Sequence, residues 1–306
     1  MVMAPPAEQG EAALSASSDA GVTVAERLQL KLAELTPAER KVARVLMAEY
    51  PVRGLQPVAK LAAAAGVSAP TVVRLVSKLS FDSYAGFQRS LKSEVSARLS
   101  SPRTMHAGRS AADGDVLSRS EQLFCDGIRA SFARLPRAEF EQAVRLLAEQ
   151  RRSVTLIGGR FSSMLAEYLA AHLRVLRPAV HVISATGADR TSTLLDIGRR
   201  DVLVAFDYRR YQHDTVRAAV MAKERGATLI AFTDPYLSPL AARADVILTS
   251  SVQSPSPFDA LTPAVALVEA VIAALVDRLG DRPLARMARY DALYAGTVDA
   301  ADGEEA

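Results

Sequence analysis

The chain has 306 residues, of which 49% are hydrophobic, and its formal net charge is +3. This length predicts about two domains with substantial cores, and the single cysteine, Cys125, excludes an internal disulfide and favours a reducing compartment. No apolar run approaches the roughly 18 residues of a membrane span, and the first residues lack the basic and apolar regions of a secretion signal. We therefore expect a cytoplasmic protein with no membrane partner.

Charge is unevenly spread along the chain. Residues 23–107 carry thirteen lysines and arginines against six acidic residues, a net charge of +7, whereas residues 108–306 are nearly neutral. Residues 1–22 carry three acidic residues and are expected to form a disordered tail. A basic module joined to a near-neutral one indicates a polyanionic partner for the first module only.

The basic module begins with two capping boxes. Thr23 is followed by Glu26, and Thr36 by Glu39, and each pair precedes an apolar run with helical spacing. These two signals predict helices that begin next to Thr23 and Thr36.

The next stretch, "PVAKLAAAAGVSAPTVVRLVSKL", has the pattern of a helix-turn-helix. Gly66 is expected to end a short helix, and Ser68 to cap a second helix that buries Val72 and Leu75. An ordinary helical hairpin with a solvated face is the alternative, but the net charge and the full spacing favour DNA binding. The solvent side of the second helix is expected to contact phosphates or base edges of a double-stranded DNA operator through Ser68, Thr71, Arg74, Ser77 and Lys78.

The stretch "LTPAERKVARVLMAEYP" and the helix-turn-helix after it resemble the N-terminal domain of the RpiR family of bacterial transcription regulators. The resemblance includes a trailing element made of Phe81, Tyr84 and Phe87. One departure is Ser80, where the family commonly has glycine. Because that position is expected to end the recognition helix, the change should matter little for DNA contact.

A second module follows a linker and helix at 108–130. Two helical segments, 116–134 and 137–150, precede a regular alternation of short apolar strands and helices within the module at 131–285. This alternation predicts an α/β domain with a doubly wound parallel sheet, and residues 286–306 are expected as a C-terminal tail. The predicted strands are 154–158, 180–184, 202–207, 228–234 and 245–250, and a long apolar helix covers 263–279.

Ligands of such sheets bind beyond the carboxyl ends of the strands. There, "IGGRFSS" offers a glycine turn and the first N–H groups of a helix, which favour an anion. "SATG" adds hydroxyls, and "DYRRYQHDT" adds two arginines between two tyrosines. The candidate ligand-binding residues are Gly158, Gly159, Arg160, Ser162, Ser163, Thr186, Tyr208, Arg209, Arg210 and Thr215.

The second module, with "GGRFSSMLAEYLAAHL" and "AKERGATLIAFTD", resembles a SIS (sugar isomerase) domain, the usual C-terminal partner in the RpiR family. In that family the glycine turn and a Ser-x-Ser-Gly-x-Thr loop hold a phosphosugar. Here Thr215 can match the final threonine, but the serines and the glycine are absent. We expect Arg209 or Arg210 to clamp an anionic ligand instead, with Tyr208 and Tyr211 stacking on a ring or restraining a guanidinium. Alternatively, one arginine faces a neighbouring subunit or an acid such as Asp207.

These patterns favour a DNA-binding regulator that senses a small anionic metabolite, a phosphosugar or sugar acid, without a cofactor. Because one helix-turn-helix reads only a half-site, a homodimer or homotetramer is expected. No metal site is expected, since the four histidines and one cysteine lack ligand spacing. Alternatives are a purely structural dimerisation domain and a sugar-phosphate aldose–ketose isomerase. The isomerase would need acid–base groups, for which the candidates are Glu167, Glu269, His172 and His213.

Overall fold

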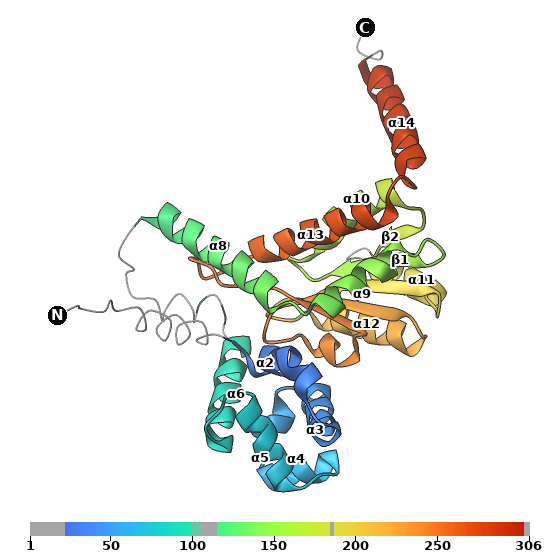
Figure 1. Ribbon diagram of the computed structural model, residues 1–306. Helices are drawn as coiled ribbons and strands as arrows, with labels where there is room; N and C mark the ends of the chain where they lie inside the picture. Colours follow the sequence, from blue (N-terminus) through green and yellow to red (C-terminus); the bar gives the residue numbers. More distant parts are fainter. Residues whose placement is uncertain (1–21, 100, 102, 104–114, 184–186, 303–306) are drawn as a thin grey trace, which may run out of the picture. The chain divides into compact units, whose positions relative to one another are not determined.

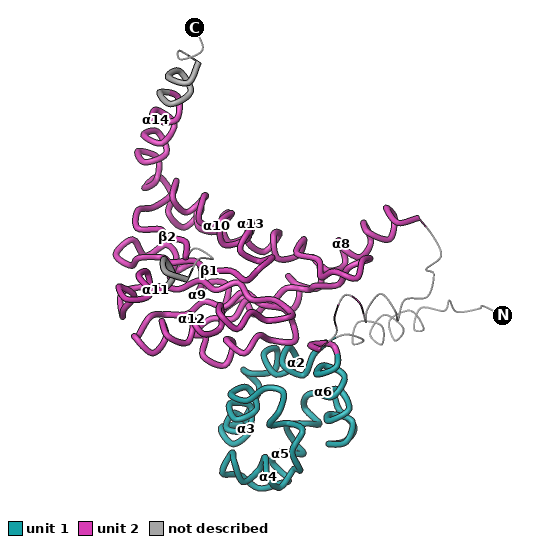
Figure 2. The backbone as a smooth tube through the Cα atoms, turned by 180° about the vertical axis from the view of Figure 1, so that it is seen from behind, with its two compact units in different colours: residues 1–96 teal, residues 97–306 magenta. Residues whose placement is uncertain are grey.

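The computed structural model describes residues 22–99, 101, 103, 115–183 and 187–302. The chain divides into two compact units, with the boundary between Ser96 and Ala97 (Figure 2). The expected N-terminal tail, except its last residue, and the candidate residue Thr186 lie outside the described residues, as does most of the expected linker before residue 115.

Unit 1 is helical. Both capping boxes form as predicted, since the Thr23 and Thr36 hydroxyls accept from the backbone N–H groups of Glu26 and Glu39. A single core, which includes Val42, joins the helices. The helices are α2 (Val24–Lys31), α3 (Pro37–Ala48), α4 (Val58–Ala65), α5 (Ala69–Lys78) and α6 (Tyr84–Leu99), with short 3₁₀ turns η1 (Leu32–Glu34) and η2 (Val52–Leu55).

Unit 2 is built on a five-stranded sheet in the order β2-β1-β3-β4-β5. Figure 1 labels β1 and β2 of this sheet. Every neighbouring pair is parallel, so the predicted fold class, a helical helix-turn-helix domain followed by a doubly wound α/β domain, is confirmed. The strand order reverses between β1 and β3, which is where open α/β sheets bind ligands. The strands are β1 (Ser153–Gly158), β2 (Val180–Val182), β3 (Asp201–Phe206), β4 (Thr228–Thr233) and β5 (Val246–Thr249).

Helices cover both faces of this sheet. Alternate strand residues such as Leu156 and Val204 pack against α9 (Arg137–Ala148), α10 (Ser163–Leu176) and α13 (Thr262–Leu279), and α8 (Val116–Arg134) packs on α13. Residues on the other face, such as Leu203, pack against a second helical layer. Two covered faces explain why the strands are continuously apolar rather than alternating. The second layer consists of α11 (Gly187–Asp196), α12 (His213–Glu224) and the 3₁₀ helix η3 (Pro239–Arg243).

Three segments differ from the expectation. The stretch "SPLAARA" forms η3 rather than an α-helix, because only five residues lie between the Ser238 cap and Ala244. Strand β2 ends at Val182 within the described residues. Residues 286–306 were expected as a tail, but most of them belong to α14 (Leu284–Asp302), whose first turns consist largely of Leu, Ala, Arg and Met, all good helix formers.

Candidate functional site

The helix-turn-helix of unit 1 is formed by α4 and α5, between which the chain bends by 102°. Gly66 makes the turn with a left-handed backbone (φ 62°), and the Val67 N–H donates to the Ala62 carbonyl at 3.0 Å. Such an angle is typical of DNA-binding helix pairs. Among the described residues no single helix is long and apolar enough to span a membrane, and α4 with α5 passes that test only as a bent pair.

The polar side chains at the beginning of α5 bond to one another. The Ser68 and Thr71 hydroxyls lie 3.1 Å apart, and Arg74 Nη2 donates to Thr71 Oγ1 at 3.1 Å. Thr71 is only 6% exposed, so its expected place on the solvent face is wrong: it supports Arg74 from inside. Ser68 stands at the N-cap position, but its side chain makes no cap hydrogen bond.

The exposed face of α5 contains Arg74 and Ser77, and also Val73, which the sequence reading missed. Val73 is 44% exposed, so this face of α5 presents an apolar side chain beside Arg74 and Ser77. Lys78 is exposed too, but its Nζ lies 2.7 Å from Glu39 Oε2 and therefore ties α5 to α3. Burial alone would raise the pKa of Glu39, but hydrogen bonds from Lys78 and Thr36 lower it.

In unit 2 a cavity of 690 Å³ opens at the strand-order reversal between β1 and β3. Another cavity, of 510 Å³, lies where β1 and β3 begin, the edge opposite to the one parallel sheets use for ligands. The first cavity is therefore the candidate ligand site. Its lining combines the glycine turn, the arginine loop and a third loop: Gly159, Arg160, Phe161, Ser162, Met164, Asp207, Tyr208, Arg209, Arg210, Gln212, Phe258, Asp259 and Leu261.

The glycine turn is packed tightly against the beginning of α10. A Cβ on Gly158 would lie 2.4 Å from Ser163 Cα, so Gly158 allows close packing of β1 and α10 rather than lining the cavity. Ser162 Oγ donates to the Phe206 carbonyl at 2.7 Å and accepts from the Gly159 N–H at 2.9 Å. The Ser162 hydroxyl therefore holds the turn closed.

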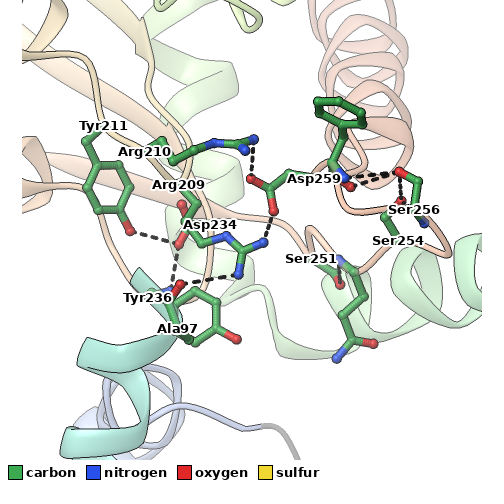
Figure 3. A network of polar contacts seen from close by, with 12 residues as sticks. Ala97, Arg209, Arg210, Tyr211, Asp234, Tyr236, Ser251, Ser254, Ser256 and Asp259 are labelled. Atoms are coloured by element: carbon green, nitrogen blue, oxygen red, sulfur yellow. Dashed lines mark hydrogen bonds and ion pairs between the residues drawn. The ribbon is translucent and has the colours of Figure 1, made fainter. Parts of the chain in front are cut away.

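The two arginines of the loop after β3 converge on one acid, Asp259, which the sequence reading did not single out (Figure 3). Arg209 Nη2 contacts Asp259 Oδ1, and Arg210 Nη2 lies 2.8 Å from Oδ2. The Arg209 and Asp259 side chains are each 7% exposed. The alternative in which an arginine pairs with an acid of the chain is thus confirmed, but the acid is Asp259 and not Asp207.

Asp207 is instead buried among groups that hold the loop. It accepts from the Gln212 N–H at 3.0 Å and from the Ser238 hydroxyl, and burial raises its pKa to about 7. The hydroxyl of Tyr208 lies 3.0 Å from Ser250 Oγ. The hydrogen-bond partners named here for Asp207 and Tyr208 thus all belong to the chain itself.

Tyr211 also has a hydrogen-bond partner within the chain. Its hydroxyl donates to Asp234 Oδ1 at 3.0 Å (Figure 3), and burial raises the Asp234 pKa to about 6. The expected stacking of Tyr208 and Tyr211 on a ligand ring therefore gives way to bonds that fix the loop.

Other candidates are not brought to the cavity. Ser163 is exposed on α10, and Thr215 is buried in the first turn of α12 without lining the cavity. Among the residues considered for an isomerase, Glu269 accepts from the Tyr168 hydroxyl, and His172 Nδ1 lies 3.0 Å from the Tyr168 carbonyl. These two, with Glu167 and His213, are outside the cavity lining. Within the described ranges no cluster of three or more His, Cys, Asp or Glu could hold a metal ion.

Family models match both units. Residues 22–100 match the helix-turn-helix domain of the rpiR family, and residues 146–274 match the SIS domain. These matches agree with the two resemblances seen in the sequence.

Solved structures and curated relatives are similar to parts of the chain. The sugar isomerase domain of an RpiR transcription factor from Sphaerobacter thermophilus is 25% identical, with a TM-score of 0.55, covering 58% of this chain and 99% of that one. Vibrio vulnificus NanR, solved with ManNAc-6P, is 18% identical and has a TM-score of 0.52 over 90% of this chain and 99% of that one, which shows a shared fold. The "Bifunctional protein glk" of Burkholderia mallei is 28% identical over 233 residues, 75% of this chain. The match spans only 35% of that relative.

Proposed function

The chain belongs to the RpiR family, and from this premise we propose that it is a cytoplasmic transcription regulator that binds operator DNA through α5 and senses a small anionic metabolite in the cavity of unit 2. The observation that carries the sensing role is the pair of arginines directed at one carboxylate beside the strand-order reversal. Guanidinium groups bind carboxylate or phosphate through paired hydrogen bonds, which suits an anionic effector.

For DNA, the proposed contacts lie on the exposed side of α5. Ser68, Ser77 and Lys78 offer donors to phosphates, and Arg74 offers a guanidinium to a guanine edge. Val73 offers an apolar surface to a thymine methyl group. Thr71 is proposed only as the support of Arg74, since its hydroxyl is buried against it.

A selection of genomic fragments, followed by affinity measurements on the chosen operator, tests the DNA-binding role. We expect Arg74→Ala to lose discrimination at one base pair. A matched control is Arg44→Ala, which removes the same charge from an exposed position of α3. Equal losses for operator and random DNA in both variants would contradict base reading by Arg74.

For the effector, a screen of anionic metabolites by thermal shift, followed by release from DNA, tests the sensing role. Sugar phosphates and sugar acids come first, because NanR was solved with ManNAc-6P and the SIS family binds phosphosugars. We propose no catalytic residue in unit 2. Turnover of a bound sugar phosphate by the wild type, lost in Glu269→Gln, would establish the isomerase instead.

We also propose a homodimer or homotetramer, because two-fold symmetry allows a palindromic operator to be read by two copies of α5. Sedimentation at micromolar concentration, with and without operator, tests this. A monomer under both conditions would contradict it.

A further inference from the structure

The ion triad in the cavity is an anion-binding site that is already filled by the chain itself. Asp259 gives one carboxylate oxygen to each arginine, and neither Arg209 nor Asp259 is more than 7% exposed. Two guanidinium groups around one carboxylate carry a net positive charge, so an anion must stay between them. The observed anion comes from the loop between β5 and α13, which belongs to a different part of the chain.

The backbone is strained to make this arrangement. Arg210 has a left-handed backbone (φ 70°), a conformation that is unfavourable for a non-glycine residue. Adjacent residues in ordinary extended backbone point to opposite sides, whereas here, with Arg210 in the left-handed region, both guanidinium groups contact Asp259. Strain of this kind persists where the surroundings hold it, and it gathers at ligand clamps.

Among the described residues of the cavity lining, most polar side chains other than the exposed Arg160 already have partners. Ser162, Tyr208 and Asp207 already have partners within the chain. Gln212 Nε2 donates to the Arg210 carbonyl at 3.1 Å. Apart from Arg160, whose guanidinium lies over the Phe161 ring, a polyhydroxylated ligand would therefore have to compete for groups that are already bonded, which costs it affinity.

Apolar side chains make up most of the remaining surface. Phe161, Met164 and Phe258 line the cavity with exposures of 60%, 55% and 58%, and Leu261 lies beside them. Phe258 immediately precedes Asp259, so one loop presents a ring and a carboxylate side by side. Exposed rings around an anion clamp suit a ligand with an apolar body.

We propose that Asp259 is an internal stand-in for the effector's anionic group, and that the effector is a small carboxylate or phosphate monoester carried on an apolar, preferably ring-shaped, body. The effector's oxyanion replaces the Asp259 carboxylate between Arg209 and Arg210, while its body packs against Phe161, Met164 and Phe258. This inference rests on the proposed sensing site but narrows its ligand away from bare sugar phosphates.

Calorimetry on the full chain tests the proposal with three probes: phenyl phosphate, inorganic phosphate and glucose 6-phosphate. In the wild type we expect phenyl phosphate to bind about tenfold more tightly than either of the others, since only it fills the apolar part. In Asp259→Asn, which removes the internal competitor, phenyl phosphate and inorganic phosphate should each bind about tenfold more tightly than in wild type.

Two controls separate this competition from a loosened loop. Asp259→Glu keeps the charge and should keep affinity near wild type, and Asp277→Asn removes a similar charge from an exposed position of α13. Unchanged or weaker binding of both anions by Asp259→Asn would overturn the proposal, as would preference of the wild type for glucose 6-phosphate or the same gain in Asp277→Asn.

The sensing role is tested separately from anion binding, by the effect of each probe on operator affinity. If phenyl phosphate binds as expected but leaves operator affinity unchanged, the anion site stands and the sensing role fails. If another metabolite releases the DNA while no probe gains affinity in Asp259→Asn, the sensing role stands and the internal stand-in is wrong.

Discussion

The two candidate binding surfaces handle arginine in opposite ways. On α5, Arg74 is exposed and donates to the hydroxyl of Thr71. In the cavity of unit 2, Arg209 is almost fully buried against a carboxylate. An exposed guanidinium is stable without a neighbouring anion, because water stabilises its charge. A buried guanidinium needs a neighbouring anion throughout the folded state. The difference shows why the buried arginine pair has an acid of the chain, Asp259, beside it.

The largest expected effect follows from that buried charge. Arg209→Ala/Arg210→Ala leaves the Asp259 carboxylate buried without its partners and should lower the free energy of unfolding by about 3–5 kcal/mol. Arg74→Ala, on the exposed surface, should change it by less than about 0.5 kcal/mol. Urea denaturation followed by circular dichroism measures both.

Adding Asp259→Ala to the double variant should restore much of the stability, because no charge is then left buried. A double variant as stable as the wild type would mean that the triad contributes nothing in the folded state.

The second contrast is in pH dependence. Burial raises the pKa of Asp207 to about 7, so folded unit 2 binds a proton that the unfolded chain releases near pH 4. Stability from this group is therefore greatest at low pH and is lost as pH rises, by about 2–3 kcal/mol between pH 5 and 8. Asp234, with a pKa raised to about 6, acts in the same direction.

Glu39 of unit 1 has the opposite sign, because its lowered pKa gives stability that is present at neutral pH and lost in acid. Thermal unfolding at pH 5, 6, 7 and 8 checks the contrast. Asp207→Asn should flatten the decline between pH 5 and 8. An unaltered slope would show that Asp207 does not carry the proton.

A third test concerns DNA recognition alone. Arg74→Ala should weaken operator binding by about 1–3 kcal/mol if Arg74 reads a base edge, and should relax specificity there. Replacing thymine by uracil at each operator position should weaken the wild type where Val73 contacts a methyl group, and should leave Val73→Ala unaffected at that position. Electrophoretic mobility shifts at fixed salt measure both.

The smallest effect is expected at the end of α5. Ser80 has a left-handed backbone (φ 64°), which explains why the family commonly has glycine there. Ser80→Gly should stabilise the protein by up to about 1 kcal/mol, since relief of strain exceeds the entropy cost of glycine. Operator affinity should not change. Destabilisation in a thermal melt would show that the serine side chain has a partner that offsets the strain.

The two units also differ in how much of each could be predicted from the sequence. The helices of unit 1 could be predicted because their signals are local. Thr23 forms a capping box with Glu26, three residues away, and Gly66 lies inside the motif whose turn it makes. The sheet of unit 2 could be predicted from its short apolar strands. Thr71 was misplaced because it sits on the boundary between the buried and exposed sides of α5, which spacing alone does not resolve.

The acid that pairs with Arg209 and Arg210 could not be predicted from the sequence. Asp259 lies 49 residues beyond Arg210, in a loop of serines and prolines with no periodic pattern. Nothing in the local sequence marks it as the partner of two arginines. Likewise, Ser162 stands where a phosphate ligand would be sought, and only the three-dimensional arrangement reveals that its hydroxyl closes the turn.

The strand order also has a consequence for synthesis on the ribosome. The core of unit 1 is assembled from residues that leave the ribosome before any strand of unit 2 exists. By contrast, β1 lies inside the sheet and cannot be paired on both sides until β3 has been made, and the arginine clamp stays open until the loop with Asp259 emerges later still. We therefore expect nascent chains to be able to recognise DNA before they are able to respond to a metabolite.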